Sequence, residues 1–319
     1  MRISEQIRDI KEHDMVLYAR LKGGRPPLPR GCKTFLLEVF ARAMILTQVV
    51  AEAGYAISEP TDYSRNGSDL LEPQGQKLIE DQIARDDPWL TTVSFPCGPW
   101  NPLTRFTMAR YEHLHREYSE LREKSRPMLD WIANLSAERI KRGRTVLVEN
   151  GWRCDSLDQE EFKKLYEIQD PIIGEPFEFV SGDQCVHGKK DYESGVPIQA
   201  ATAWGTTSEC LKRRLGQTCK GDHEHQHVQG RNAFGLRSAQ KAVWERELCV
   251  ESFKSSVEEL HLRQDWSAFP GVVIEEERLE RGSLDEPDEE DLQTTVLVQY
   301  CLTSRRLNRR RWTSSSFQA

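Results

Sequence analysis

Short apolar runs alternate with amphipathic stretches between residues 34 and 150, and this alternation is the feature that most restricts the fold. The apolar runs have the length of strands, and the stretches between them carry apolar residues at helical spacing. The predicted strands cover 34–41, 56–62, 90–95 and 144–150, and the predicted helices cover 43–55, 75–87 and 105–142, the last broken at Pro127. Such alternation predicts a doubly wound, mostly parallel α/β sheet. Weaker strand signals follow at 177–182 and 202–208.

Chemically useful side chains stand where these predicted strands end. They are Phe40 after the first strand, Glu59 or Asp62 after the second, Cys97 after the third and Glu149 at the end of the fourth. The third strand runs into VSFPCGPWNPL, where glycine and prolines stop both strand and helix. Because ligands of doubly wound sheets bind at the carboxyl ends of strands, these residues are candidates for one common site.

A thiol and a carboxylic acid at neighbouring strand ends suit one kind of reaction. A cysteine thiolate attacks electron-poor ring carbons. A pyrimidine becomes electron-poor at C6 when an acid engages its N3, and burial would raise the pKa of Glu149 enough for it to hold that proton. Attack by Cys97 would then make C5 nucleophilic enough to accept a methyl group. The simpler alternatives are a buried structural cysteine at position 97 and a tight turn at residues 149–151.

The order of these segments resembles the DNA cytosine-5 methyltransferases. LEVFARAMILTQVVAEAGY is similar to the opening strand and turn of that family, SEPTDY to its acidic second strand end, GSDLL to its Gly-Asp turn, SFPCGPW to its Pro-Cys segment, and MLDWIANLSAERIKRGRTVLVENG to its Glu-Asn segment. The resemblance implies Cys97 and Glu149 as the catalytic pair. It also implies S-adenosylmethionine as cofactor, with Phe40 on the adenine, Glu59 or Asp62 on the ribose and Asp69 on the adenine amino group. The implied substrate is a flipped cytosine; the resemblance favours DNA, and the sequence leaves the choice between DNA and RNA open.

Several positions differ from that family pattern. Arg42 and Ala43 replace glycines that let the backbone approach a cofactor. Gln199 is followed by Ala-Ala-Thr-Ala instead of two arginines. The layout also resembles pieces of retroelement polyproteins. The alternative function is therefore a non-catalytic nucleic-acid-binding or scaffold module, and the alternative role of Asp69 is that of a helix cap.

Cysteines and histidines concentrate in the later part of the chain, as Cys185, His187, Cys210, Cys219, His223, His225, His227 and Cys249. Tetrahedral zinc takes four nitrogen or sulfur ligands, often in close pairs. CKGDHEHQH supplies close pairs, although its spacing is not that of a zinc finger. We predict Cys219, His223 and His225 as the first ligands, with Cys185 or Cys249 completing the set. The alternative is an exposed histidine loop without metal.

Charge and hydropathy exclude several classes of function. The 319 residues carry a formal net charge of -7, so nucleic-acid binding would depend on a local basic patch. No apolar run is long enough to cross a bilayer, and the N-terminus MRISEQIRDIKEHD is charged throughout. We therefore expect an intracellular protein, nuclear or cytoplasmic, without membrane contact. Its eight cysteines would then be reduced thiols.

The expected organisation has four parts. Residues 1–30 form an amphipathic helix and a linker, and residues 31–205 form the α/β domain. A small Cys/His-rich appendage covers 206–272. Residues 273–319 form an acidic disordered spacer with a basic tail, because dense like charge prevents the burial of a core.

Overall fold

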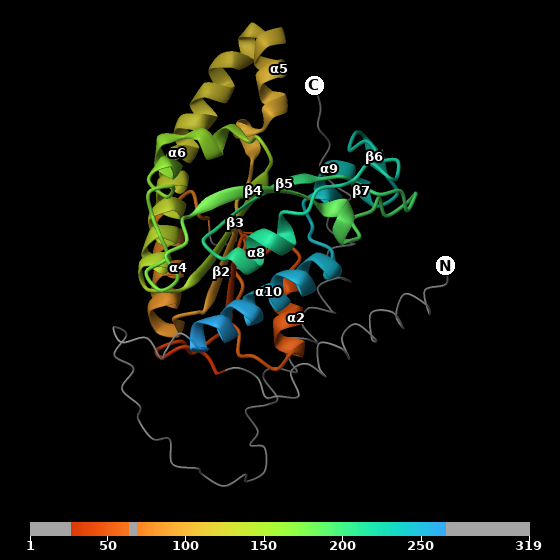
Figure 1. Ribbon diagram of the computed structural model, residues 1–319. Coiled ribbons are helices and arrows are strands. Elements are labelled where there is room, and N and C mark those ends of the chain that lie inside the picture. The colour runs from red at the N-terminus through yellow and green to blue at the C-terminus, as the bar shows by residue number, and fades with distance from the viewer. Residues whose placement is uncertain (1–26, 64–68, 266–319) are drawn as a thin grey trace, which may run out of the picture. The chain divides into compact units, whose positions relative to one another are not determined.

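The computed structural model describes residues 27–63 and 69–265. A five-stranded sheet forms its core, with the strands in the order β1-β2-β3-β5-β4 (Figure 1). The strands are β1 Leu36–Val39, β2 Leu90–Ser94, β3 Thr145–Gly151, β4 Glu178–Asp183 and β5 Ala201–Thr206. The first three strands are parallel to one another, and β5 runs antiparallel to its neighbours β3 and β4. The predicted α/β class with a mostly parallel sheet is thus confirmed.

The predicted strand at 56–62 lies beside β1 as an extended segment. It makes isolated parallel bridges with β1 at Ile57 and Thr61. Pro60 lies between them and has no backbone N–H to donate, which explains why no continuous ladder forms. The chain thus leaves β1 toward one side through this segment and returns to the other side as β2. In an open α/β sheet, such a reversal of strand order marks the place where ligands bind.

Helices cover both faces of the sheet (Figure 1). One face packs against α4 Pro73–Asp86, α6 Glu112–Lys141 and α7 Glu160–Lys163; the other packs against α2 Ile45–Glu52, α8 Glu209–Leu215 and α10 Arg246–Asp265. Side chains alternate between the two faces along each strand. In β3, Val146 and Val148 join the apolar cluster under α6, whereas Leu147 joins the cluster under α10. We call these two sides the α6 face and the α10 face.

The long helical segment after β2 breaks at a different residue from the one predicted. It consists of α5 Pro102–Arg110 and α6, separated at Tyr111, and Pro127 lies inside α6. A proline inside a helix costs about 3 kcal/mol. Here Met128, Leu129 and further residues of α6 are buried against the sheet, so burial of the following turns outweighs the lost hydrogen bond.

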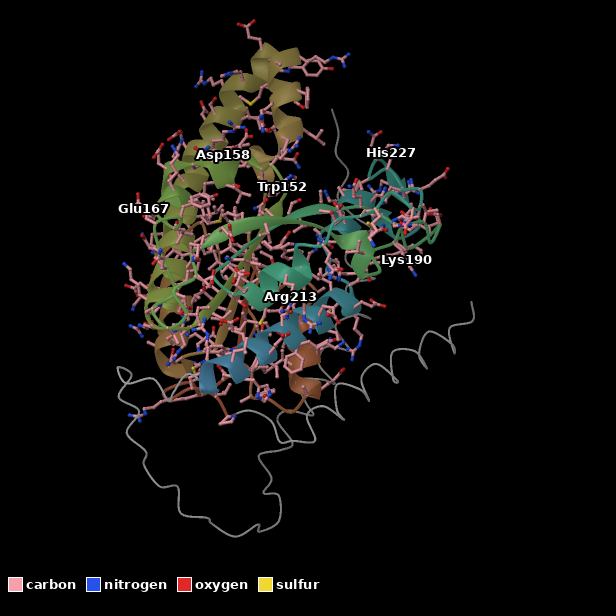
Figure 2. The ribbon with its side chains drawn as sticks, in the orientation of Figure 1. Trp152, Asp158, Glu167, Lys190, Arg213 and His227 are labelled. Atoms are coloured by element: carbon pink, nitrogen blue, oxygen red, sulfur yellow. The ribbon has the colours of Figure 1, made fainter. Side chains whose placement is uncertain are left out.

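A small lobe adjoins the sheet and carries two cysteines, Cys185 and Cys219, and four histidines, His187, His223, His225 and His227. This Cys/His lobe consists of residues 184–200 and 217–245, and it contains η4 Gln184–His187, β6 Arg231–Asn232, β7 Gly235–Leu236 and α9 Arg237–Lys241. Figure 2 shows Lys190 and His227 on it. The lobe draws residues from both sides of the predicted boundary at 205, and α8 and α10, which follow that boundary, pack on the sheet.

Three expectations concern residues at the chain ends or membranes. The predicted helix within residues 1–30 lies outside the described residues, and so do the acidic spacer and basic tail of 273–319. Among residues 27–63 and 69–265, no helix combines the length and the apolarity that a membrane crossing requires.

Candidate functional site

An open hollow lies at the carboxyl ends of β1 and β2, where the strand order reverses. It contains about 330 Å³ of space that is continuous with solvent. Its lining consists of Glu38, residues 40–46, Ser94, residues 242–244 and Cys249. Residues 242–244 connect α9 to α10 and form one wall. The end of the sheet where the strand order reverses is the usual location of ligand sites in doubly wound folds.

A carboxylate from β1 occupies the N-terminus of α2 beside this hollow. Glu38 is buried and accepts hydrogen bonds from the Thr47 amide at 2.6 Å and from the Thr47 hydroxyl. Met44, which precedes α2, has a φ of 53° and provides no side-chain cap. A free helix N-terminus attracts phosphate. Because Glu38 already accepts from the Thr47 amide, the protein itself supplies the negative charge at this helix end.

Phe40 and Arg42 both line the hollow. Phe40 is half-buried and has a φ of 62°, in the left-handed region that residues other than glycine seldom adopt. Arg42 is exposed, and its guanidinium donates to the Ala239 carbonyl of α9 at 3.4 Å. Arg42 therefore bridges the rim of the hollow, between the turn after β1 and α9.

The three acids expected to contact the cofactor do not line the hollow. Glu59 is exposed, and its carbonyl accepts a hydrogen bond from Gln82 at 2.7 Å. Asp62 lies in the extended segment beside β1 and is half-buried. Asp69 accepts from the Leu71 amide at 3.0 Å, ahead of α4. Its side chain thus caps a turn and not the helix, since the N-cap of α4 is Glu72; the alternative role of a helix cap is therefore wrong as well.

Cys97 and Glu149 lie on opposite faces of the sheet. Glu149 follows Leu147 by two residues in β3, so its side chain points to the α10 face, where it interacts with Ser94 and Trp244. Cys97 packs against the apolar cluster of the α6 face, and Asn101 Nδ2 lies 3.7 Å from its Sγ. The described contacts of the two side chains thus belong to different faces of the sheet.

Burial changes the acid–base properties of Glu149. Desolvation raises the pKa of Glu149 to about 7, although Ser94, Lys241 and Trp244 act in the opposite direction. This matches the expectation that burial would favour its protonated form. A carboxylic acid that titrates near neutral pH can hold or accept a proton at this end of the sheet.

Four side chains of the Cys/His lobe converge on one point. The ligand atoms of Cys185, Cys219, His223 and His225 all lie within 4.8 Å of one another. Cys219 Sγ lies 3.6 Å from His223 Nε2 and 3.5 Å from His225 Nε2. Two sulfurs and two imidazole nitrogens form a complete set for a tetrahedral metal ion. We call these four residues the metal group.

Neighbouring acids orient the metal group. The Asp222 carboxylate lies 2.8 Å from His223 Nδ1, which leaves Nε2 free to face a metal ion. The Asp183 carboxylate accepts from the Cys219 amide at 2.8 Å. Burial and the neighbouring Cys219 thiol raise the pKa of Cys185 to about 12, so a metal ion must displace its proton on binding. Sequence reasoning did not identify these supporting acids, since nothing in their spacing distinguishes them from surface acids.

The structure decides which cysteine completes the predicted ligand set. Cys185 joins the three ligands predicted first, whereas Cys249 is buried in α10 and lines the hollow. His187 is buried beside α10, with no hydrogen-bond partner for Nε2 among the described residues.

A scan of this chain against protein-family models and a search of curated protein sequences found no match.

Proposed function

We propose that this protein is a non-catalytic nucleic-acid-binding module whose Cys/His lobe is held together by a zinc ion. One observation carries the zinc site: the metal group draws its ligands from two segments that are more than thirty residues apart in sequence, yet all four ligand atoms lie within 4.8 Å of one another. Four protein ligands leave no open position for water or substrate, which is typical of a structural site. The chemistry that zinc supplies here is a rigid link between η4 and the loop at 217–230.

An exposed surface near α5 supports nucleic acid as the partner. Phe106 and Tyr111 are 72% and 43% exposed, and Trp152, just past the end of β3, is 36% exposed (Figure 2). Arg110 lies 5.5 Å from the centre of the Tyr111 ring, and Arg153 is exposed beside Trp152. Aromatic rings interleaved with guanidinium groups stack on bases and neutralise phosphates in single-stranded nucleic acids.

The zinc proposal is tested by the metal content of the purified full-length protein. We expect one zinc per chain by mass spectrometry of the metal, and loss of that zinc in Cys219→Ala. Cys210→Ala is the matched control, because Cys210 is a buried thiol of α8 that does not belong to the metal group. Equal metal content in both variants, or no zinc in the wild type after its addition, would refute the site.

Binding of a fluorescent single-stranded DNA tests the partner. Replacing Trp152 or Phe106 by alanine should weaken binding about tenfold, because stacking on one base contributes about 1–3 kcal/mol. Phe234→Ala is the control, since Phe234 is similarly exposed, at 62%, but lies on the Cys/His lobe. An RNA of the same sequence shows whether DNA is preferred. Equal effects of all three variants would argue against this surface.

A second candidate is the S-adenosylmethionine-dependent cytosine methyltransferase implied by the resemblance. The hollow at the strand reversal, lined by Phe40, favours it, and so does Glu38, because S-adenosylmethionine carries a sulfonium cation and no phosphate. Against it, Glu59, Asp62 and Asp69 do not line the hollow, so the residues present do not fit the cofactor as the family pattern requires. Cys97 and Glu149 also face different sides of the sheet.

Two measurements separate this candidate from the first. Calorimetry with millimolar S-adenosylmethionine should give no heat if the module is non-catalytic. In the presence of S-adenosylmethionine, DNA containing 5-fluorocytosine traps an attacking thiolate covalently, because after methyl transfer C5 carries fluorine in place of the proton whose loss would release the enzyme. Cys97→Ser is the control. A covalent adduct that requires Cys97 would overturn the non-catalytic assignment.

A further inference from the structure

A buried lysine joins the Cys/His lobe to the wall of the hollow. The Lys189 side chain has no exposed surface. Its Nζ lies 2.7 Å from the Gln240 carbonyl, 2.6 Å from the Val243 carbonyl and 3.0 Å from the Glu245 carboxylate. An ammonium group has three N–H donors, so these acceptors use all of them. One side chain thus holds the whole connection between α9 and α10.

That connection forms one wall of the hollow. Val243 and Trp244 line the hollow, and Trp244 packs edge-on against Trp204 at 5.3 Å between ring centres. Cys249, in the first turn of α10, lines the same space and is fully buried. Movement of the connection would therefore expose Cys249.

The backbone around Lys189 is attached to the metal group on two sides. The Lys189 amide donates to the Gln184 carbonyl at 3.1 Å, next to Cys185. On the other side, Lys190 forms a bridge with Pro197, whose carbonyl accepts from the Gln226 amide at 2.7 Å, next to His225. The hairpin that carries Lys189 thus lies between two ligand-bearing segments.

Metal–ligand bonds would fix these two segments relative to each other. The contacts between the described side chains of the metal group include thiol–imidazole approaches of 3.5 and 3.6 Å, the interaction between the Cys185 and Cys219 thiols, and an edge-on contact of the two imidazole rings at 4.6 Å. Thiols are weak donors and acceptors, so these are weak interactions. Four coordinate bonds are far stronger and are lost together when the ion leaves. The position of Lys189 is therefore expected to depend on the metal.

We propose that metal binding at Cys185, Cys219, His223 and His225 positions Lys189 and, through it, holds the connection between α9 and α10 in place over Cys249. The ion then controls access to the hollow from a site on the adjoining lobe. This inference rests on the zinc site proposed above and adds a regulatory role to it.

The test follows the alkylation rate of Cys249 in the full-length protein, measured for each cysteine peptide by mass spectrometry. Removing the metal with a chelator should accelerate alkylation of Cys249 at least about tenfold, because the free energy of local opening at the connection between α9 and α10 becomes smaller. Adding zinc back should restore the slow rate. Cys210 is the matched control, because it is also a buried thiol but lies on α8, away from the hollow.

A second variant tests the lysine directly. Lys189→Met should leave Cys249 reactive even with zinc bound, since it cannot hold the Gln240 and Val243 carbonyls. If this variant does not fold, the chelation experiment decides alone. Suppose that the purified protein contains zinc, and that removing it leaves the alkylation rate of Cys249 unchanged or accelerates Cys210 equally. Either result would overturn the coupling but not the zinc site. A protein that binds no zinc at all would overturn both.

Discussion

The sheet and the Cys/His lobe are stabilised in different ways. In the sheet, apolar side chains such as Leu147 and Trp89 are completely buried between two layers of helices. In the lobe, the fully buried groups include charged ones: Lys189 and Asp191 are enclosed, whereas the aromatic Phe234 is 62% exposed. Hydrophobic burial is not directional, but a polar network depends on every partner being in place. The lobe is therefore the region whose structure can respond to a bound ion, and the sheet is the rigid support.

The largest expected loss of stability comes from a buried polar group that lies outside the Cys/His lobe. Arg263 of α10 donates to Asp170 at 2.6 Å and to Glu259 at 2.9 Å, and all three side chains are buried. Arg263→Met would leave two carboxylates buried without their cation, and we expect a loss of about 3–5 kcal/mol in the free energy of unfolding by urea. Arg213→Met is the control, because Arg213 is exposed, and its loss should stay below about 1 kcal/mol.

Truncation of the apolar core should have a slightly smaller effect. Leu147→Ala in β3 should lower the free energy of unfolding by about 2–5 kcal/mol, because it leaves a cavity between the sheet and α10. The zinc content of the folded protein should not change. Leu103→Ala, at a position that is 69% exposed, serves as the control. A loss of zinc in Leu147→Ala would show that sheet and lobe are not stabilised independently.

Glu149, near the carboxyl end of the central strand β3, makes the stability of the protein depend on pH. The pKa of Glu149 rises from its usual 4.5 to about 7 because the fold buries it. The folded state therefore binds the proton more tightly, and this contribution to stability falls as pH rises from 4.5 to 7 and is constant above that range. Glu149→Gln should remove the fall, which amounts to at most about 3 kcal/mol. Parallel stability–pH curves for both proteins would contradict the assignment.

The smallest global effect is expected from metal removal. Without the ion, trypsin should cleave the lobe quickly at Lys220 or Arg231, both exposed, while the free energy of unfolding of the sheet changes by less than about 1 kcal/mol. Asp222→Asn should weaken zinc binding without removing it, since it alters only the support of His223. A destabilisation as large as that of Leu147→Ala would erase the distinction between the two regions.

Much of the sheet could be predicted from sequence because its signals are local. The runs around Leu36, Leu90 and Thr145 became β1, β2 and β3, and the weaker signals near 177 and 202 became β4 and β5. The misplaced break at Pro127 shows the limit of a local rule: tertiary burial of the following turns outweighed the cost of the proline.

For the candidate sites too, groupings that are local in sequence could be predicted, and those between distant residues could not. Cys219, His223 and His225 are close in sequence, so their grouping could be predicted, and the choice of Cys185 over Cys249 required the fold. Glu38 looked like part of a buried strand, yet it caps α2 beside the hollow. The neighbouring strand ends of Cys97 and Glu149 suggested a common site, but the position of a residue along a strand does not reveal its face once a loop intervenes.

By itself, the sequence determined which segments become strands and helices, and which side chains can bind a metal ion or hold a proton, since these depend on local pattern and residue chemistry. Only the tertiary structure decided that Cys185 meets the histidines, that Lys189 reaches the wall of the hollow and that Glu149 faces away from Cys97. Those relations join residues that are distant in sequence, and they depend on strand order and on the alternation of side chains across the sheet.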